Sequence, residues 1–177
     1  IDMLGEVFIN YGDEVVYCSP TYEAFPDMIS DNGGVRVELP LTKDYCYDLD
    51  AMLAAITDKT KMVIVCNPNN PTGMLTDREF LFKLLRVCRE MDIFLVVDEC
   101  FQDFIRDPGQ YSLKAQLSRY HNLFLLKAFT KRYAMAGVRL GYGITENEEL
   151  LEKMTLATQP WNISVPAQAA GIAALQE

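Results

Sequence analysis

The sequence predicts an α/β protein with three layers, in which helices cover both faces of a mostly parallel β-sheet. Short apolar runs alternate with amphipathic stretches of helical length, as expected of strands joined by crossover helices. Several runs are apolar throughout rather than alternating, which is typical of strands that are buried on both faces. Half of the 177 residues are hydrophobic, so a sizeable core can form.

Six short runs are expected to form the strands of this sheet. Each has the length of a β-strand, and none approaches the length of a membrane-spanning helix. No internal repeat or flexible linker separates them, so we expect a single domain over residues 1–177. The expected strands cover residues 14–18, 35–39, 61–66, 93–97, 123–126 and 139–144.

Helices are expected between and beyond these strands. Thr76 and Glu79 have the spacing of a capping box, which predicts a helix from there to about residue 91. Its apolar residues recur at helical spacing, which indicates one buried face. Asp48 is expected to cap a helix that ends near residue 55. Other expected helical segments are residues 146–157 and 166–176 and, as the end of a helix, residues 2–10.

Composition argues against several classes of function. Acidic residues outnumber basic ones by 25 to 16, and no cluster of Lys and Arg suggests a nucleic-acid partner. The five cysteines are scattered without CxxC spacing, which favours reduced thiols in a cytoplasmic protein. His121 is the only histidine, so neither a His-rich metal site nor a Ser-His-Asp triad is expected. There is no signal-peptide pattern, and we expect no membrane partner.

Polar residues follow three of the expected strands, at the edge of an α/β sheet where ligands bind. The loop 67–73 is either an ordinary turn or a rigid loop that directs an Asn amide into the crevice. Asp98 follows the strand 93–97. Because a bare buried charge is costly, its carboxylate should either cap a helix or join an ion pair, or else bind a cationic nitrogen of a ligand.

A third polar group follows the strand 123–126. Lys131 beside Arg132 is most simply a solvated pair of charges, but Lys131 could also supply an amine nucleophile. Thr130 and Arg139 could hold a phosphate through hydroxyl and guanidinium contacts. Together, the three groups match the needs of pyridoxal 5'-phosphate (PLP), whose ring nitrogen pairs with a carboxylate and whose aldehyde is held by a lysine.

Four motifs occur in one order along the chain, namely Pro20-Thr21-Tyr22, the loop 67–73, Asp98-Glu99, and Thr130-Lys131 followed by residues 137–142. In these motifs the chain resembles the large domain of fold-type I, class I/II PLP-dependent aminotransferases, in the branch of histidinol-phosphate aminotransferase and threonine-phosphate decarboxylase. The resemblance covers nearly the whole chain. It implies that residues 1–177 are a PLP-binding large domain, cut at both ends, without the small domain.

The resemblance also implies roles for the polar residues of the motifs. Lys131 would hold the PLP aldehyde as a Schiff base and move the proton of the substrate Cα, and Asp98 would pair with the ring nitrogen. Asn70 would donate a hydrogen bond to the ring 3-oxygen. The Asn70–Pro71 bond is expected to be cis, as in related enzymes.

The remaining cofactor contacts include two departures from the family pattern. Thr130 and Arg139 would bind the phosphate, but Ala128 stands where many members have a Ser or Thr that adds a further contact. Tyr22 would stack on the ring, unless it is a simple core aromatic. Phe101 would lie beside the ring where many aminotransferases have a Tyr, and it cannot donate a hydrogen bond to the 3-oxygen.

The implied activity is transamination of an amino acid or of a phosphorylated amine such as histidinol phosphate. One alternative is a threonine-phosphate decarboxylase, which Phe101 favours because such sequences tend to have Phe there. Another is a fragment that at most binds PLP. The full-length protein is expected to be a homodimer, and no metal is expected. The residues that select the substrate are expected mostly outside the chain, so the substrate stays open.

Overall fold

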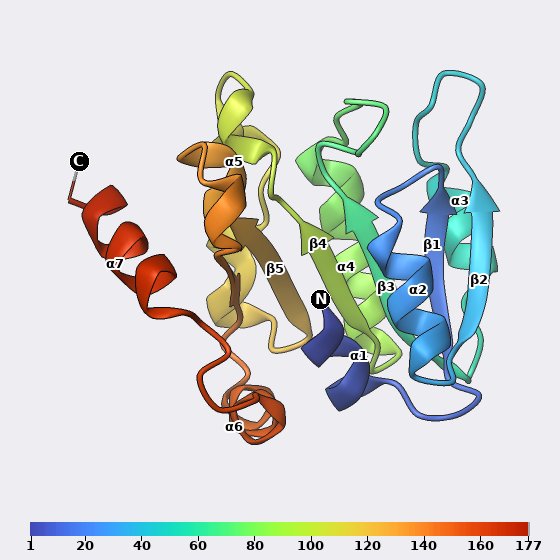
Figure 1. Ribbon diagram of the computed structural model, residues 1–177. Coiled ribbons are helices and arrows are strands. Elements are labelled where there is room, and N and C mark those ends of the chain that lie inside the picture. The colour runs from blue at the N-terminus through green and yellow to red at the C-terminus, as the bar shows by residue number, and fades with distance from the viewer. Residues whose placement is uncertain (177) are drawn as a thin grey trace.

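The computed structural model describes residues 1–176 and shows a six-stranded sheet in the order β2-β1-β3-β4-β5-β6. The first five strands in this order are parallel, and β6 runs antiparallel to β5. Helices lie on both faces of the sheet (Figure 1), so the expected α/β fold with a mostly parallel sheet is confirmed. The strands are β1 (Glu14–Ser19), β2 (Val35–Pro40), β3 (Thr60–Cys66), β4 (Phe94–Asp98), β5 (Leu123–Ala128) and β6 (Gly141–Ile144).

Short helices and turns connect these strands. Within residues 1–176, no helix is long and apolar enough to cross a membrane. The α-helices are α1 (Asp2–Phe8), α2 (Ala24–Asp31), α3 (Leu49–Ala54), α4 (Arg78–Glu90), α5 (Phe129–Arg132), α6 (Glu148–Ala157) and α7 (Val165–Ala174). The 3₁₀ helices are η1 (Gln102–Phe104), η2 (Pro108–Gln110), η3 (Lys114–Arg119) and η4 (Ala136–Val138).

The side chains of the strands alternate between two halves of the core. One half lies between the sheet and the helices α1 and α2, and the other lies between the sheet and α3 and α4. Both β3 and β4 are buried almost throughout, which explains their uninterrupted apolar sequences. The buried face of α4 follows the expected apolar stripe and consists of Leu81, Leu84, Leu85 and Cys88.

Several element boundaries differ from the sequence expectations. The expected Thr76 cap is wrong, because α4 begins one residue later and the Asp77 carboxylate accepts from the Phe80 N–H. Both backbone groups of Thr76 bond the side chain of Asn67. Asp48 caps α3 as expected. The strand β6 begins at Gly141 instead of residue 139, because Arg139 has a left-handed backbone (φ 55°) that cannot continue a strand.

Candidate active site

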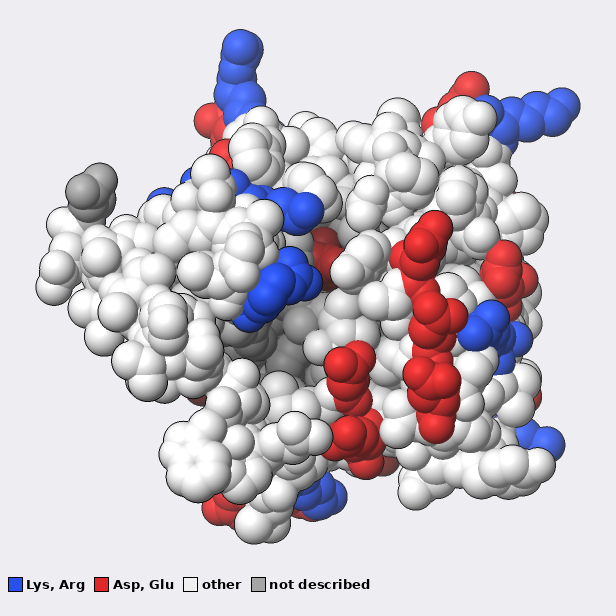
Figure 2. Space-filling model, in the orientation of Figure 1, with Lys and Arg blue, Asp and Glu red and all other residues white. Residues whose placement is uncertain are grey.

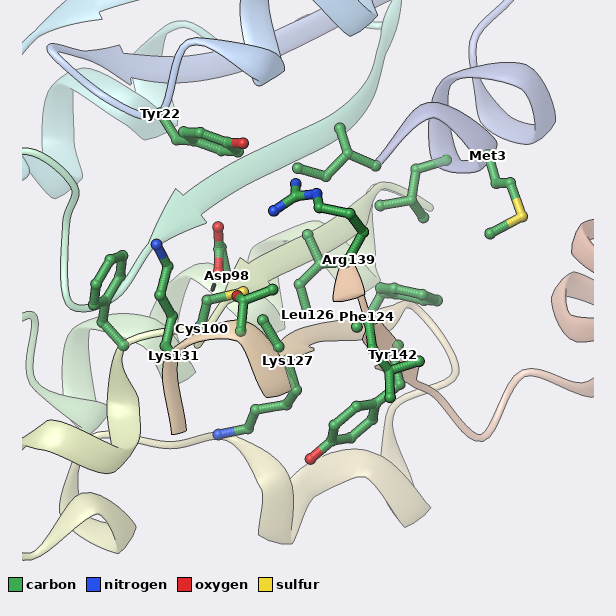
Figure 3. Close-up of a pocket in the computed structure, with 18 of the residues that line it drawn as sticks. Met3, Tyr22, Asp98, Cys100, Phe124, Leu126, Lys127, Lys131, Arg139 and Tyr142 are labelled. Atoms are coloured by element: carbon green, nitrogen blue, oxygen red, sulfur yellow. Dashed lines mark hydrogen bonds between the residues drawn. The ribbon is translucent and has the colours of Figure 1, made fainter. Parts of the chain in front are cut away.

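A pocket of about 380 Å³ lies at the carboxyl ends of β4 and β5, beside the start of α1. Its volume is in the range of small-molecule sites. Segments far apart in the sequence meet there, including α1, the loops after β1, β3 and β4, and the chain from β5 to β6 (Figure 3). All of the site residues expected from the sequence line this pocket, namely Tyr22, Asn70, Asp98, Phe101, Thr130, Lys131 and Arg139.

Charge is unevenly distributed around this pocket. In Figure 2 the pocket is a hollow with basic side chains on one rim, while acidic side chains lie over α1 and α2 on the other side. Two basic residues that line the pocket, Lys131 and Arg139, are solvent-exposed. Because a cleft rimmed with one sign of charge attracts the opposite sign, the basic rim favours an anionic group in the ligand.

Asp98 ends β4 and contributes a carboxylate to the pocket. It is 5% exposed, and its Oδ1 accepts a hydrogen bond from the Cys100 N–H at 2.9 Å. Burial raises the pKa of Asp98, and the hydrogen bonds from the side chain and backbone of Cys100 offset this only in part. In the described part of the chain, Asp98 forms no ion pair. A protonated nitrogen of a ligand would therefore be stabilised beside it.

Lys131 reaches the same pocket from the neighbouring strand. The chain leaves β5 at Ala128 and turns directly into α5, which is anchored by the buried Phe129 stacked on Tyr133 (ring centroids 5.2 Å apart). Figure 3 shows the Lys131 side chain directed toward Asp98. The Lys131 Nζ lies 4.8 Å from the ring centroid of Phe101, so the amine rests on an aromatic face.

Arg139 is held in an unusual backbone conformation at the opposite side of the pocket. Its φ of 55° lies in the left-handed region, which costs about 1 kcal/mol for a residue with a Cβ. The guanidinium donates to the Ala136 carbonyl at 3.3 Å, and Figure 3 shows it directed toward Tyr22. Tyr22 is 38% exposed and packs edge-on against Phe25, with the ring centroids 5.8 Å apart. Its ring is therefore a pocket wall rather than a core aromatic.

The loop after β3 is tied to the rest of the chain by two buried Asn side chains. Asn67 is fully buried, and its amide bonds both backbone groups of Thr76 and the Tyr111 carbonyl. Asn69 is 2% exposed and donates to the Pro20 carbonyl at 3.1 Å. These contacts hold the loop in one position, with Asn70 facing the pocket.

Two of the loop's peptide bonds are cis. The Asn70–Pro71 bond is cis as expected, and the Asn67–Pro68 bond is also cis. A third cis bond joins Ser19 to Pro20 at the end of β1.

Several pocket residues were missed by reasoning from the sequence. Cys100 lies beside Asp98, and burial together with the nearby carboxylate raises the pKa of its thiol, so the thiol stays protonated. Ala128 lines the pocket without a hydroxyl, as the sequence indicates. Apolar walls come from several elements, and the period-two pattern of β5 could have identified the two walls that belong to it. These wall residues are Met3, Leu4, Phe124, Leu126, Tyr142 and Met154.

The groups that line the pocket fit PLP chemically. The buried Asp98 carboxylate, which has no cationic partner within residues 1–176, suits the protonated ring nitrogen. The Thr130 hydroxyl and the Arg139 guanidinium are suitable donors for a phosphate, and Lys131 supplies a primary amine for an aldehyde.

Comparisons with known proteins agree with this geometry. Residues 1–177 match the family described as aminotransferase class I and II. The histidinol-phosphate aminotransferase of Caldicellulosiruptor saccharolyticus is 33% identical over 175 residues, covering 99% of this chain and 48% of that protein. The aromatic amino acid aminotransferase of Streptomyces avermitilis is 39% identical over 166 residues, covering 93% of this chain and 45% of that protein.

A solved structure gives the same result. The histidinol-phosphate aminotransferase of Clostridium acetobutylicum superposes with a TM-score of 0.87 at 32% identity, over 97% of this chain and 49% of that one. The chain therefore spans about half the length of the relatives that it matches. The profile match over the full sequence and the shared fold show that the chain belongs to the class I and II aminotransferase family.

Proposed function

We propose that this protein is a PLP-dependent aminotransferase in which residues 1–177 form the cofactor-binding large domain and Lys131 is the lysine that binds the cofactor. The observation that carries the proposal is the convergence on one pocket of Asp98, from the end of β4, with Lys131 and Arg139, from the connection between β5 and β6. We further propose that the whole protein is a homodimer. The free state of all five cysteines supports a cytoplasmic location.

Each polar group has one task toward the cofactor. Asp98 would hold the ring nitrogen, Asn70 would donate to the ring 3-oxygen, and Thr130 and Arg139 would bind the phosphate. When bound, PLP supplies an electron sink for the bonds at the substrate Cα. The raised pKa of Asp98 falls when a cation is placed beside it, so the carboxylate and the protonated nitrogen would keep each other charged.

The reaction also requires proton transfer by a group of this chain. The Lys131 amine, when it is neutral, would take the proton from the substrate Cα. It would then return this proton at the aldehyde carbon of the cofactor. Its position over the Phe101 ring keeps it within the pocket. The apolar walls formed by Phe124, Leu126 and Tyr142 would help to exclude water from this step.

The proposed substrates are an amino acid or a phosphorylated amine such as histidinol phosphate, in keeping with the names of the relatives. A 2-oxo acid would accept the amino group. Assays of the whole protein with histidinol phosphate and with aromatic amino acids, each with a 2-oxo acid acceptor, would distinguish these two classes. Turnover that does not depend on the acceptor would contradict transamination.

Absorption spectroscopy tests the cofactor assignment directly. Adding PLP to the purified chain should produce a visible absorption band that is lost in Lys131→Ala. The band should persist in Lys153→Ala, since Lys153 lies on α6 in an exposed ion pair with Glu149. Borohydride reduction followed by peptide mass spectrometry should place the label on Lys131. Labelling of another lysine would reject the assignment.

A second candidate activity is decarboxylation of O-phosphothreonine. Phe101 favours it, because threonine-phosphate decarboxylase-like sequences tend to have Phe at this position, and the residue lines the pocket. Release of CO2 from O-phosphothreonine without any 2-oxo acid would support this activity. Turnover that needs the 2-oxo acid and releases no CO2 would reject it.

A further inference from the structure

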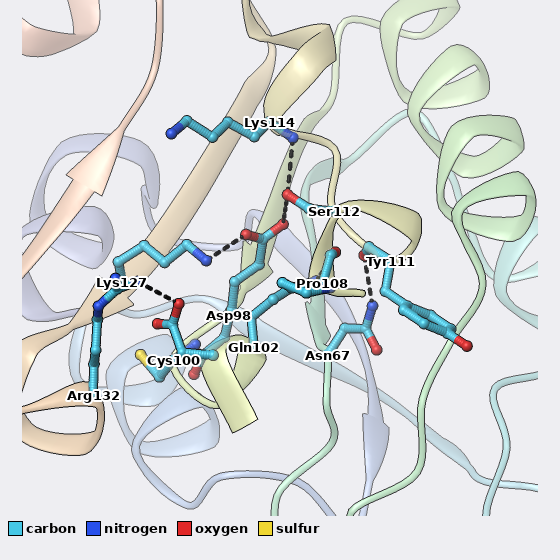
Figure 4. Close-up of polar contacts among 12 residues, drawn as sticks. Asn67, Asp98, Cys100, Gln102, Pro108, Tyr111, Ser112, Lys114, Lys127 and Arg132 are labelled. Atoms are coloured by element: carbon cyan, nitrogen blue, oxygen red, sulfur yellow. Dashed lines mark hydrogen bonds and ion pairs between the residues drawn. The ribbon is translucent and has the colours of Figure 1, made fainter. Parts of the chain in front are cut away.

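A buried ion pair lies behind the candidate active site, on the opposite face of the sheet. One partner, Lys127, is also among the residues that line the pocket. The Lys127 Nζ lies 2.9 Å from the Glu99 Oε2. Figure 4 draws this ion pair as a dashed line from the amine of the labelled Lys127. The Glu99 side chain is fully buried and that of Lys127 is 14% exposed. Side chains alternate along a strand, so Glu99 points away from the pocket that Asp98 faces. Figure 3 likewise shows Lys127 directed away from Asp98.

The same carboxylate also holds a loop in place. The Ser112 hydroxyl donates to the Glu99 Oε1 at 2.8 Å, and the Ser112 Oγ accepts from the Lys114 N–H at 3.0 Å. Ser112 lies between η2 and η3, in the segment that follows η1. One carboxylate oxygen of Glu99 therefore forms an ion pair with Lys127 of β5, and the other accepts a hydrogen bond from this loop.

The pair joins the two strand ends that carry the proposed catalytic groups. Glu99 follows Asp98 directly in the sequence, and Lys127 lies near the end of β5, shortly before Lys131 in α5. Between them runs the backbone hydrogen bond from the Glu99 N–H to the Leu126 carbonyl, at 3.0 Å. Past this hydrogen bond β4 is no longer paired with β5, whose last residues, Lys127 and Ala128, pair with β6. The ion pair thus links β4 and β5 at the point where the backbone pairing between them ends.

A contribution to stability alone does not account for an ion pair at this place. The desolvation of two charges offsets most of their attraction, and apolar residues of similar volume are often as stabilising or more so. A buried ion pair does, however, fix geometry, because both partners must meet for either to be tolerated. Because the pair lies between the ends of β4 and β5, it can fix the distance between these two strand ends.

We propose that Glu99 and Lys127 are positioning residues, which fix the separation of Asp98 and Lys131 and thereby the geometry of the cofactor site. This inference rests on the proposed function, since PLP is the ligand that both groups would contact. Neither Glu99 nor Lys127 is assigned a contact with PLP or substrate. Their effect is transmitted through the ends of β4 and β5.

The test separates positioning from stability. The double variant Glu99→Leu/Lys127→Met replaces the pair with apolar side chains of similar length. Glu99→Asp keeps the charge but shortens its reach by one methylene. The control is Glu79→Leu/Lys83→Met, which removes an ion pair of the same 2.9 Å length from the exposed face of α4. For each protein, urea unfolding gives the stability, and titration of the Lys131-dependent absorption band gives the dissociation constant of PLP.

We expect the apolar double variant to unfold at the urea concentration of the parent or above it. Its PLP dissociation constant should rise about tenfold, comparable to the loss when a residue that orients a metal ligand is removed. Glu99→Asp should weaken PLP binding in the same direction, and the exposed control should leave it unchanged. Folded variants that bind PLP as tightly as the parent would overturn the inference.

If the double variant does not fold, the PLP dissociation constant of Glu99→Asp alone tests the positioning role. A parent chain without a Lys131-dependent band would instead reject the proposed function, and this inference with it. A parent band with unaltered affinity in the variants would reject only the positioning role. The two failures are therefore distinguishable.

Discussion

Asp98 and Glu99 are consecutive carboxylates at the end of one strand, and they have opposite surroundings. Glu99 faces the α4 side of the sheet, where Lys127 and Ser112 engage both of its oxygens. Asp98 faces the pocket, where burial raises its pKa and no ion pair compensates it in the described residues. Burial alone therefore does not mark a functional carboxylate. A buried carboxylate whose partners are missing is the one that a ligand can complete.

The largest expected effect is loss of stability on the α4 side. Glu99→Gln leaves the Lys127 ammonium buried without a counter-charge, so the free energy of unfolding should fall by about 3–5 kcal/mol. Urea denaturation at neutral pH measures this change. A matched Glu79→Gln at the exposed pair on α4 should lower stability far less, because solvent screens both of its charges. Equal losses at both sites would show that the buried Glu99 contributes no more to stability than an exposed carboxylate.

The corresponding change on the pocket side should have the opposite sign. Asp98→Asn removes a buried charge that has no cationic partner, so the cofactor-free chain should be more stable than the parent at neutral pH. PLP binding should weaken by about 1.5–3 kcal/mol, because a charge-assisted contact is lost. Unfolding and spectral titrations measure the two changes.

The pH dependence of stability provides the control for this prediction. The pKa of Asp98 is raised in the folded chain, so the folded state binds the proton more tightly than the unfolded state. Its stabilising contribution is therefore complete below the ordinary Asp pKa of about 3.9, and it is lost as pH rises through the raised pKa. The advantage of Asp98→Asn should grow over that rise. A pH-independent difference would contradict the account.

The contrast between these two carboxylates was only partly predictable from the sequence. The apolar runs predicted the strands that end at Asp98 and precede Lys131, because buried parallel strands are encoded locally. The partners of Glu99 could not be predicted, because Ser112 and Lys127 meet it only after the sheet has formed. A local sequence pattern predicts where a strand ends, but it does not predict which side chains from other parts of the chain contact that end.

Loops and caps show the same limit. Asn67 was known only as part of a turn-forming loop, yet it is fully buried because the Tyr111 carbonyl, 44 residues away, accepts from its amide. The same amide bonds both backbone groups of Thr76, and the next residue, Asp77, caps α4. The left-handed backbone of Arg139 had no signal either, since no Gly or Asn marks the position.

A smaller effect should come from restoring the hydroxyl that Phe101 lacks. Phe101→Tyr adds a donor to a pocket that has room for it, so PLP binding should strengthen by about 1 kcal/mol. Titration of the absorption band measures the change. The control is Phe104→Tyr on the neighbouring 3₁₀ helix, whose ring is 67% exposed and should not affect binding. Unchanged affinity in Phe101→Tyr would show that position 101 does not face the cofactor's polar edge.

The smallest expected effect concerns Arg139, whose backbone conformation is unfavourable for its side chain. Asn tolerates the left-handed region better than Arg, so Arg139→Asn should raise the stability of the cofactor-free chain by up to about 1 kcal/mol. The same change should weaken binding of PLP and of inorganic phosphate, because the guanidinium is lost. Arg106→Asn, an exposed control with ordinary backbone geometry, should do neither. A stability loss in Arg139→Asn would mean that the hydrogen bond to Ala136 outweighs the strain, and that the pocket side also contains residues selected for stability.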